Sequence, residues 1–342
     1  MNAWVNPLLL AASCVAQPVA PRAPATPAAC TDYRFVFDDI DRFEDALDAI
    51  ESGTPPTEAI ERYLEAGSPG LRTWMRIYGS DPERFGKIVA QRPKYFRGVV
   101  AKRAAFEAAT PDIACGYDAL QRLAPGAFDD QLPTYLFVTA LGGGGSVRKP
   151  GVLLGVDYFA LGDDLDPAEF PEGIIPDGRL SLVRPEALAH TAVHEMVHHV
   201  QRDRQGLMRY ASMYTVRTRA TMLAYAIREG GADFLATLAT GDEPDRNTFA
   251  RASERALWTE FSATLGDHPD DHPGWFSGRS PQHPRWPFQI GYAMGFLIVE
   301  EFYRASADKP AALETILSVS KPEALRRMLE PYRRKMRGAS AH

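Results

Sequence analysis

The segment from His190 to Gln201 reads HTAVHEMVHHVQ and holds four histidines and one glutamate. It belongs to a run of helix-forming residues that begins after Pro185, a residue type favoured at the first helical position. Four residues advance about 400° on a helix of 3.6 residues per turn, so His194 and His198 project from one face. Their imidazoles are therefore placed to bind a single cation.

The glutamate of this segment has a different place on the helix. Glu195 is rotated about 100° from His194, which suits a carboxylate that lies over a metal-bound water rather than on the metal itself. The pattern His-Glu-x-x-His thus predicts two zinc ligands, His194 and His198, and one general base, Glu195.

The rest of this helix is apolar on nearly every side, which indicates burial, and buried imidazoles need partners. His199 lies about 140° from His194, so we expect it to pack or to support a ligand. His190 is the competing ligand. No carboxylate follows it, however, and a pair that uses it leaves Glu195 poorly placed, so we expect it beside the ligands.

A catalytic zinc needs a third protein ligand and keeps its fourth position for water. The segment IREGGADF lies on a helix that we predict from about Tyr214 to Gly241. Glu229 and Asp233 share one face of it, and acidic groups on an apolar face are costly without a cation or hydrogen bonds. We therefore predict Glu229 as the third ligand and Asp233 as the acceptor for a ligand histidine N–H.

Glycines need an explanation at two places in the chain. Gly230 and Gly231 each cost roughly 1 kcal/mol in a helix interior, and we expect them to let this helix approach the histidine helix. The run Gly142 to Gly145 lacks the Gly-Lys-Ser/Thr of a phosphate loop, so nucleotide binding is not favoured. It predicts either a mobile hairpin connection or an edge strand whose backbone lies near an extended ligand.

The chain divides into three parts: an export-like segment with a Pro/Ala tether (residues 1–29), an N-terminal helical region (30–125) and a region with the metal-binding pattern (126–342). Apolar residues recur at helical spacing from Asp32 to Leu123. Residues 133–140 and 151–159, PTYLFVTA and GVLLGVDYF, are strand-like. We predict an α+β fold, predominantly α-helical, with a small β-sheet before the histidine helix.

The composition excludes several classes of function. With 342 residues, 45% hydrophobic and 24% charged, the chain is typical of soluble globular proteins. A net charge of -6 offers no basic surface for phosphates, which argues against nucleic acid and anionic membrane as partners. No stretch approaches the ~20 apolar residues of a membrane span.

The first residues, MNAWVNPLLLAASC, place a short apolar run before small residues and a cysteine. This is typical of an export signal with a lipobox-like end, so Cys14 is predicted to carry a lipid. A disordered cytosolic tail is the alternative. In an exported chain, Cys30 and Cys115 are the remaining thiols, and an oxidising compartment favours a disulfide between them. A reducing cytosol would leave two buried thiols.

HEMVH followed by EGGAD resembles the gluzincin branch of zinc metallopeptidases. More narrowly, it is similar to the bacterial family of predicted zinc-dependent proteases related to gliding-motility lipoproteins. The resemblance covers roughly Leu132 to Tyr303 and includes a Tyr-x-x-Gly helix, here Tyr292 and Gly295. It implies a zincin-like fold, one Zn²⁺ per chain and a peptide or protein substrate. Arg228 departs from it, because many gluzincins have Asn there.

The resemblance implies metal-assisted hydrolysis of peptide bonds. Zinc on His194, His198 and Glu229 is expected to activate a water, while Glu195 takes the proton and passes it to the leaving amine. Tyr292 is the first choice for a donor to the oxyanion, although packing in a helix core explains a tyrosine equally well.

Other roles remain open at this point. Arg285 and His283 are alternative oxyanion donors. His268 and His272 lie in a polar loop that lines a cleft entrance, binds an extra cation or, as we expect first, is simply solvated. The function expected first is a zinc peptidase in the periplasm or on a lipid anchor. An envelope-assembly lipoprotein with a structural zinc and a zinc hydrolase of non-peptide amides are the alternatives. A purely structural site has no need of Glu195.

Overall fold

The computed structural model describes residues 30–79, 81–129, 131–170, 182–277, 280 and 282–338. The export-like segment, its tether and Cys14 lie outside these ranges, so lipidation stays a prediction. Within them, helix predominates and one small sheet accompanies it. The α+β class with a predominance of helix is therefore confirmed. No helix in these ranges is both long enough and apolar enough to cross a membrane.

Short helices occupy the chain from Asp38 to Leu123, as the spacing of apolar residues predicts. The helical prediction from Asp32 is wrong at its start, because Phe35–Val36 pairs with a later strand and forms β1. Several begin with proline, whose missing N–H costs no hydrogen bond in the first turn. Ser68 and Asp81 cap two of them by accepting a hydrogen bond from a first-turn N–H. These helices are α1 (Asp38–Glu51), α2 (Pro56–Ala66), α3 (Pro69–Tyr78), α4 (Pro82–Ala90), α5 (Pro93–Ala101), α6 (Arg103–Ala108) and α7 (Thr110–Leu123).

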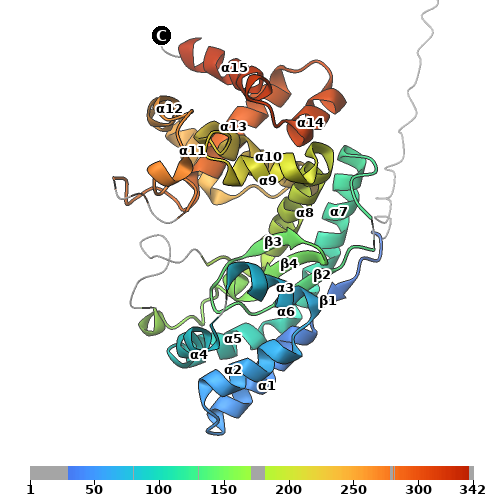
Figure 1. The fold of residues 1–342 in the computed structure, drawn as a ribbon, viewed down its shortest axis with the longest axis vertical. Helices are drawn as coiled ribbons and strands as arrows, with labels where there is room; N and C mark the ends of the chain where they lie inside the picture. Colours follow the sequence, from blue (N-terminus) through green and yellow to red (C-terminus); the bar gives the residue numbers. More distant parts are fainter. Residues whose placement is uncertain are drawn as a thin grey trace, which may run out of the picture.

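A four-stranded sheet lies between α1 and α3 of this region and the helix that carries the histidines (Figure 1). The strands are β1 (Phe35–Val36), β2 (Thr134–Phe137), β3 (Gly145–Arg148) and β4 (Gly151–Gly155). Their order is β1-β2-β4-β3, with β3 antiparallel to β4 at one edge and the other pairs parallel. Of the glycine run, only Gly145 lies in this edge strand, and Gly142 to Gly144 form the loop before it. The prediction of an edge strand is thus confirmed for Gly145 alone, and its contact with an extended ligand stays a prediction.

The second predicted strand stops at Gly155, earlier than expected. Val156–Phe159 forms a 3₁₀ turn that carries the buried Asp157 carboxylate back to the end of β2. This carboxylate accepts hydrogen bonds from the backbone N–H groups of Thr139 (2.8 Å) and Leu141 (2.5 Å). Burial raises the pKa of Asp157 to about 6, although these hydrogen bonds act to lower it. The bonds fix the loop that leads from β2 into β3.

The C-terminal half is arranged around α8 (Leu188–Gln205), which follows a 3₁₀ turn at Pro185–Ala187. Helix α8 packs against β3, α7, α10 and α14, so it is buried on nearly every side, as predicted (Figure 1). The other elements are η2 (Pro167–Glu169), α9 (Leu207–Thr215), α10 (Met222–Thr240), α11 (Asp245–Ala252), α12 (Glu254–Ala263), η4 (Pro269–Asp271), α13 (Ile290–Ala305), α14 (Lys309–Ser318) and α15 (Pro322–Gly338).

The helix predicted from Tyr214 to Gly241 is in fact two helices. The chain leaves α9 after Thr215, and α10 begins at Met222 because the Thr221 hydroxyl caps its first turn at 3.2 Å. The predicted stop at Gly241 is confirmed, with a left-handed φ of 82°. Tyr214 therefore belongs to α9 and reaches α10 only through space.

The glycine pair of α10 serves a different contact from the predicted one. A Cβ on Gly230 would lie 2.1 Å from the backbone of Gly295 in α13, and a Cβ on Gly295 would lie 1.8 Å from the carbonyl oxygen of Ala226. Helices α10 and α13 thus cross in direct backbone contact, which requires glycine. The prediction that Gly230 faces α8 is wrong; Gly231 is the nearer one, with its Cβ position 3.7 Å from Gln201.

A disulfide joins Cys30, at the start of the described chain, to Cys115 in α7. This is the pair that the sequence analysis singles out. Two hydrogen bonds accompany it, because the Asp118 carboxylate accepts from the backbone N–H of Thr31 at 2.8 Å and from the Tyr33 hydroxyl at 2.9 Å. The segment before β1 is therefore attached to α7.

Replacing both cysteines with alanine is expected to lower the free energy of unfolding by about 4 kcal/mol, because the cross-link closes a long loop in the unfolded chain. The two cysteines are 85 residues apart in sequence. Urea denaturation measures the difference. Reduced wild-type protein is the control and should show the same loss, whereas equal stability of the oxidised, reduced and substituted forms would contradict the prediction.

Candidate metal centre

The two histidines of the His-Glu-x-x-His pattern project from α8 toward the same point. His194 and His198 are both buried, and their Nε2 atoms lie 3.0 Å apart. An imidazole nitrogen without a proton is an acceptor, so two of them at this distance need a shared proton or a shared cation.

Glu229 reaches this point from α10. Its Oε2 lies 3.0 Å from the Nε2 of His198 and 3.6 Å from the Nε2 of His194, and the residue is buried. A tetrahedral zinc with bonds of 2.0–2.1 Å sets its donor atoms roughly 3.3 Å apart. The three residues therefore fit one such ion in number, chemistry and spacing, and they form one of the groups able to hold a metal within the described ranges.

The outer nitrogen of each histidine is held by a buried side chain. The Nδ1 of His194 lies 2.8 Å from Oδ1 of Asp233, and the Nδ1 of His198 lies 2.9 Å from Oε1 of Gln201. A proton on each Nδ1 leaves the Nε2 lone pair free for a metal. Asp233 is placed as the sequence predicts. Gln201 was missed, and its one signal is its position three residues after His198 on the same helix.

Asp233 has further partners that keep it ionised. The Nε2 of His190 lies 3.4 Å from its Oδ1, and the Arg246 guanidinium of α11 donates to its Oδ2. Burial acts to raise the pKa of Asp233, but Arg246, His190 and His194 outweigh it and hold the pKa well below its usual range. His190 thus lies beside the ligands, as expected, and also contacts the carbonyl oxygen of Asp242 at 3.1 Å.

The second oxygen of Glu229 is occupied by a tyrosine that the sequence analysis did not identify. The hydroxyl of Tyr214 donates to its Oε1 at 2.7 Å, which leaves Oε2 to face the histidines. Arg228 holds this tyrosine, because its guanidinium lies 3.7 Å from the centre of the Tyr214 ring and donates to the carbonyl oxygen of Tyr210 at 3.2 Å. Arg228, the residue before Glu229, thereby holds α9 against the candidate centre.

Glu195 lies between this centre and the edge strand. It is half-buried on α8, and a Cβ added to Gly145 of β3 would lie only 2.9 Å from its Cγ. Burial raises its pKa and Glu229 adds to this effect, while His198 and His194 oppose it. A carboxylate with a raised pKa beside a metal centre is suited to accept and return a proton.

Tyr292 reaches the other side of His194 from α13. Its ring is nearly parallel to the imidazole, at 16° with centroids 6.0 Å apart, and the Arg246 guanidinium lies 5.3 Å from its centre. Burial raises its pKa well above the usual value, so the phenol keeps its proton. Its hydroxyl forms no hydrogen bond with the residues that the structure describes.

In the metal-free protein, a proton takes the place of the cation. Burial alone lowers the pKa of His194, but hydrogen bonds to Asp233 and Glu229 outweigh burial and raise this pKa to about 10. For the carboxyl of Glu229, burial acts in the opposite direction and raises the pKa, but His198 and His194 outweigh it and hold this pKa well below its usual range. A histidinium therefore lies between two carboxylates, and a metal must displace its proton.

The remaining histidines of the sequence analysis lie elsewhere. His199 is half-buried and accepts a hydrogen bond from Arg202 at 2.8 Å. His272 and His283 each contact a carboxylate on the surface, Asp267 at 2.8 Å and Glu260 at 2.7 Å, and His268 caps the short turn η4. Arg285 is exposed. Among the described residues, these side chains do not join the candidate centre.

Comparisons of the chain with protein-family models, with curated proteins and with solved structures found no match. The chemistry of the centre is therefore inferred from its own atoms. The donor set is two imidazole nitrogens and one carboxylate oxygen, which suits zinc and other transition metals.

We expect the metal-free protein to bind one zinc ion and to release about one proton per ion near pH 7.5. The pKa of His194 of about 10 means that this histidine is protonated there, so apparent affinity rises about tenfold per pH unit from pH 6 to pH 8. Calorimetry in buffers of different ionisation enthalpy measures the released proton.

Two variants provide the controls for this titration. His198→Ala should abolish stoichiometric binding, whereas His199→Ala, one residue along the same helix, should leave it intact because this imidazole faces Arg202. Zinc binding that survives His198→Ala, or that releases no proton, would contradict the assignment.

Proposed function

We propose that this protein is a zinc-dependent peptidase of the gluzincin type. The observation that carries the proposal is the convergence of His194, His198 and Glu229 within bonding reach of one ion, with Glu195 left beside them and free of any metal ligand role. A zincin-like fold and a kinship with predicted zinc-dependent proteases are part of the proposal.

The hydrolytic role divides between the metal and the chain. A bound zinc supplies Lewis acidity at the scissile carbonyl and lowers the pKa of water toward ~7. Glu195 accepts a proton from the attacking water and passes it to the leaving amine, so that the amine departs neutral. Its raised pKa supports both transfers, because a weaker acid holds the proton until the amine takes it.

The tetrahedral intermediate carries a negative charge that needs a hydrogen-bond donor. We assign this role to Tyr292, whose ring lies against the ligand His194 and whose hydroxyl has no partner among the described residues. The high pKa of Tyr292 keeps the phenol a donor. His283 and Arg285 are weaker candidates, because His283 contacts Glu260 and Arg285 is exposed.

The edge strand supports a peptide as substrate. Within the part of the chain that the structure describes, β3 pairs with β4 on one side only, and its first residue, Gly145, touches Glu195. An extended peptide can add to such an edge through backbone hydrogen bonds, which would carry its scissile bond past the carboxylate.

We also propose that the enzyme works outside the cytoplasm, in the periplasm or on a lipid anchor at Cys14. The disulfide between Cys30 and Cys115 supports this location, because such bonds persist in oxidising compartments. Cysteine 14 itself lies outside the described residues.

Glu195→Gln is expected to lower kcat on a mixed peptide library about 10³-fold while zinc stays bound, because the amide keeps the shape but cannot take a proton. Mass spectrometry of the products and metal analysis of the same samples provide the two measurements. Glu186→Gln, an exposed glutamate ahead of the same helix, is the matched control and should retain full activity.

The outcomes separate the competing functions. If the wild type and Glu195→Gln both bind zinc and neither cleaves peptides, the zinc is structural, as in an envelope-assembly lipoprotein. If the wild type alone then cleaves non-peptide amides, the protein is instead an amide hydrolase. Absence of stoichiometric metal from wild-type protein supplied with zinc would overturn the whole proposal.

Tyr292→Phe should lower kcat about 10²-fold with little change in KM, because the lost hydrogen bond forms mainly in the transition state. Steady-state kinetics on one peptide found in the library measures both constants. Tyr303→Phe removes a hydroxyl from the same helix away from the centre and serves as the control. A kcat within twofold of wild type would assign Tyr292 to packing alone.

A further inference from the structure

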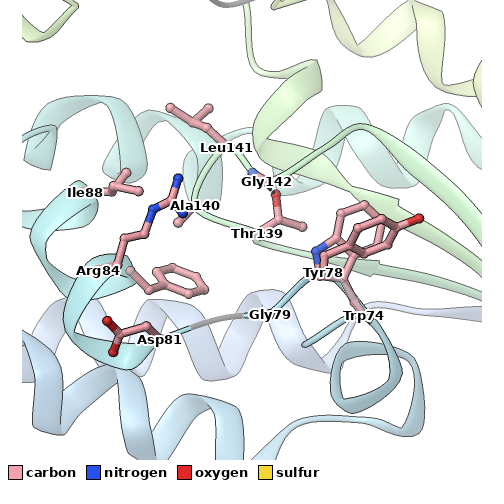
Figure 2. A pocket seen from close by; sticks show the side chains of 11 residues that line it. Trp74, Tyr78, Gly79, Asp81, Arg84, Ile88, Thr139, Ala140, Leu141 and Gly142 are labelled. Carbon is pink, nitrogen blue, oxygen red and sulfur yellow. Dashed lines mark hydrogen bonds between the residues drawn. The ribbon is translucent and has the colours of Figure 1, made fainter. Parts of the chain in front are cut away.

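A cavity of about 230 Å³ opens on the side of the edge strand away from α8. Helices α3 and α4 form two of its walls, and the loop from Thr139 to Gly142 that follows β2 forms the third (Figure 2). The metal centre uses none of these residues. The cavity lies between this loop and the N-terminal helical region, to which neither the sequence motifs nor the centre assign a task.

Aromatic and aliphatic side chains line the cavity beside polar groups. Trp74 and Phe85 line it and are buried, and Tyr78 packs on Trp74 with ring centroids 4.4 Å apart. Ile88 of α4 and Leu141 of the loop also line the cavity, and Figure 2 shows Ile88 across from Trp74 and Tyr78. An engineered apolar cavity of roughly 150 Å³ binds benzene, so this cavity has room for one aromatic ring.

The mouth of the cavity is polar but carries little net charge. Arg84 and Asp81 both line it and both are exposed. Opposite charges at one mouth disfavour a strongly charged occupant. Arg84 has no ion pair with any residue that the structure describes, and an arginine at the rim can lie over the face of a bound aromatic ring.

A short run of chain, from Gly142 at the wall of the cavity to Gly145 in β3, connects the cavity to the region around Glu195. The indole of Trp74 lies 3.1 Å from the Cβ position of Gly143, and the hydroxyl of Tyr78 donates to the side chain of Ser146 in β3 at 2.8 Å. Gly145, between these two points, touches Glu195. Three residues of chain span at most about 10 Å, so the wall of the cavity at Gly142 lies within that distance of Gly145, the residue that touches the candidate base.

The loop that walls the cavity is held in place before any ligand arrives. Asp157 accepts hydrogen bonds from the backbone of Thr139 and Leu141, and Ala140 and Leu141 adopt left-handed φ values of 54° and 61°. Non-glycine residues take this conformation only where surrounding contacts impose it. The shape of the cavity is thus built into the fold.

We propose that this cavity binds an aromatic side chain of the peptide substrate, two to four residues from the scissile bond. The inference rests on the proposed peptidase function. A peptide extended along β3 points alternate side chains to opposite faces of the sheet, so one that reaches Glu195 on the α8 face presents its neighbours to the face with the cavity. Substrate selection is then a task of the N-terminal helices.

The test uses alanine octapeptides in which a single phenylalanine is moved through the positions, with the zinc-loaded protein. Wild type should cleave at a fixed distance from the phenylalanine, with kcat/KM about 30-fold above that of the all-alanine peptide, as expected for burial of one ring. Ile88→Trp fills the cavity and should reduce this ratio below threefold. Arg84→Ala, on the surface, should reduce it about threefold.

Ile77→Trp is the matched control, since Ile77 is 41% exposed on α3 and does not line the cavity; its ratio should equal that of wild type. Circular dichroism verifies that each variant is folded. The proposal is overturned if Ile88→Trp and Arg84→Ala both keep the wild-type ratio of kcat/KM between the phenylalanine and all-alanine peptides. It is also overturned if this ratio is near one in the wild type.

Failure of the peptidase function gives a different result, because no peptide is then cleaved. Calorimetric titration measures binding of the same peptides without cleavage, and it still tests whether the cavity binds an aromatic side chain. Binding of the phenylalanine peptides that is at least tenfold weaker in Ile88→Trp than in Ile77→Trp supports an aromatic site, and equal binding to both, or none to wild type, overturns it.

Discussion

Two imidazoles and two carboxylates are buried between α8 and α10, and their loss of hydration is the constraint that organises the surrounding helices. Each polar atom that faces outward from this group has a protein partner. Gln201 and Asp233 hydrogen-bond to the outer nitrogens of the histidines, and Tyr214 donates to one oxygen of the Glu229 carboxylate. The Arg246 guanidinium donates to Asp233. Only the inward-facing atoms are left for a shared proton or a cation.

Helical spacing explains why much of the centre was predictable. On a helix, the interval between residues determines the direction of each side chain, so His194 and His198 had to face one point and Glu195 another. The same rule paired Glu229 with Asp233. Two strands of the sheet, β2 and β4, and the helices before them followed from short apolar runs separated by prolines and glycines, because these residue types end one element and begin the next. The strand β1 was not predicted, and β3 was only one of two alternatives for the glycine run, because neither is a distinct apolar run.

The missed features depend on contacts between elements, which spacing does not encode. Tyr214 was assigned to the wrong helix because the break before Thr221 has no glycine or proline, and only the cap shows where α10 begins. Arg246 meets Asp233 from a helix whose position relative to α10 is set by packing. The glycine pair announced a close approach, yet only the folded structure identifies α13 as the partner of Gly230.

The backbone contact between α10 and α13 sets the smallest possible separation of these two helices. Gly230 directly follows the candidate ligand Glu229, and Gly295 lies one turn after Tyr292, so the contact lies close to both side chains. At an ordinary helix crossing, the separation drifts over evolution as core side chains grow or shrink. Between α10 and α13 the backbones already touch at Gly230 and Gly295, so no side chain at this crossing can change the separation of the helices. The distance between Glu229 and Tyr292 therefore does not depend on the size of side chains elsewhere in the core, and the rest of the protein is free to diverge.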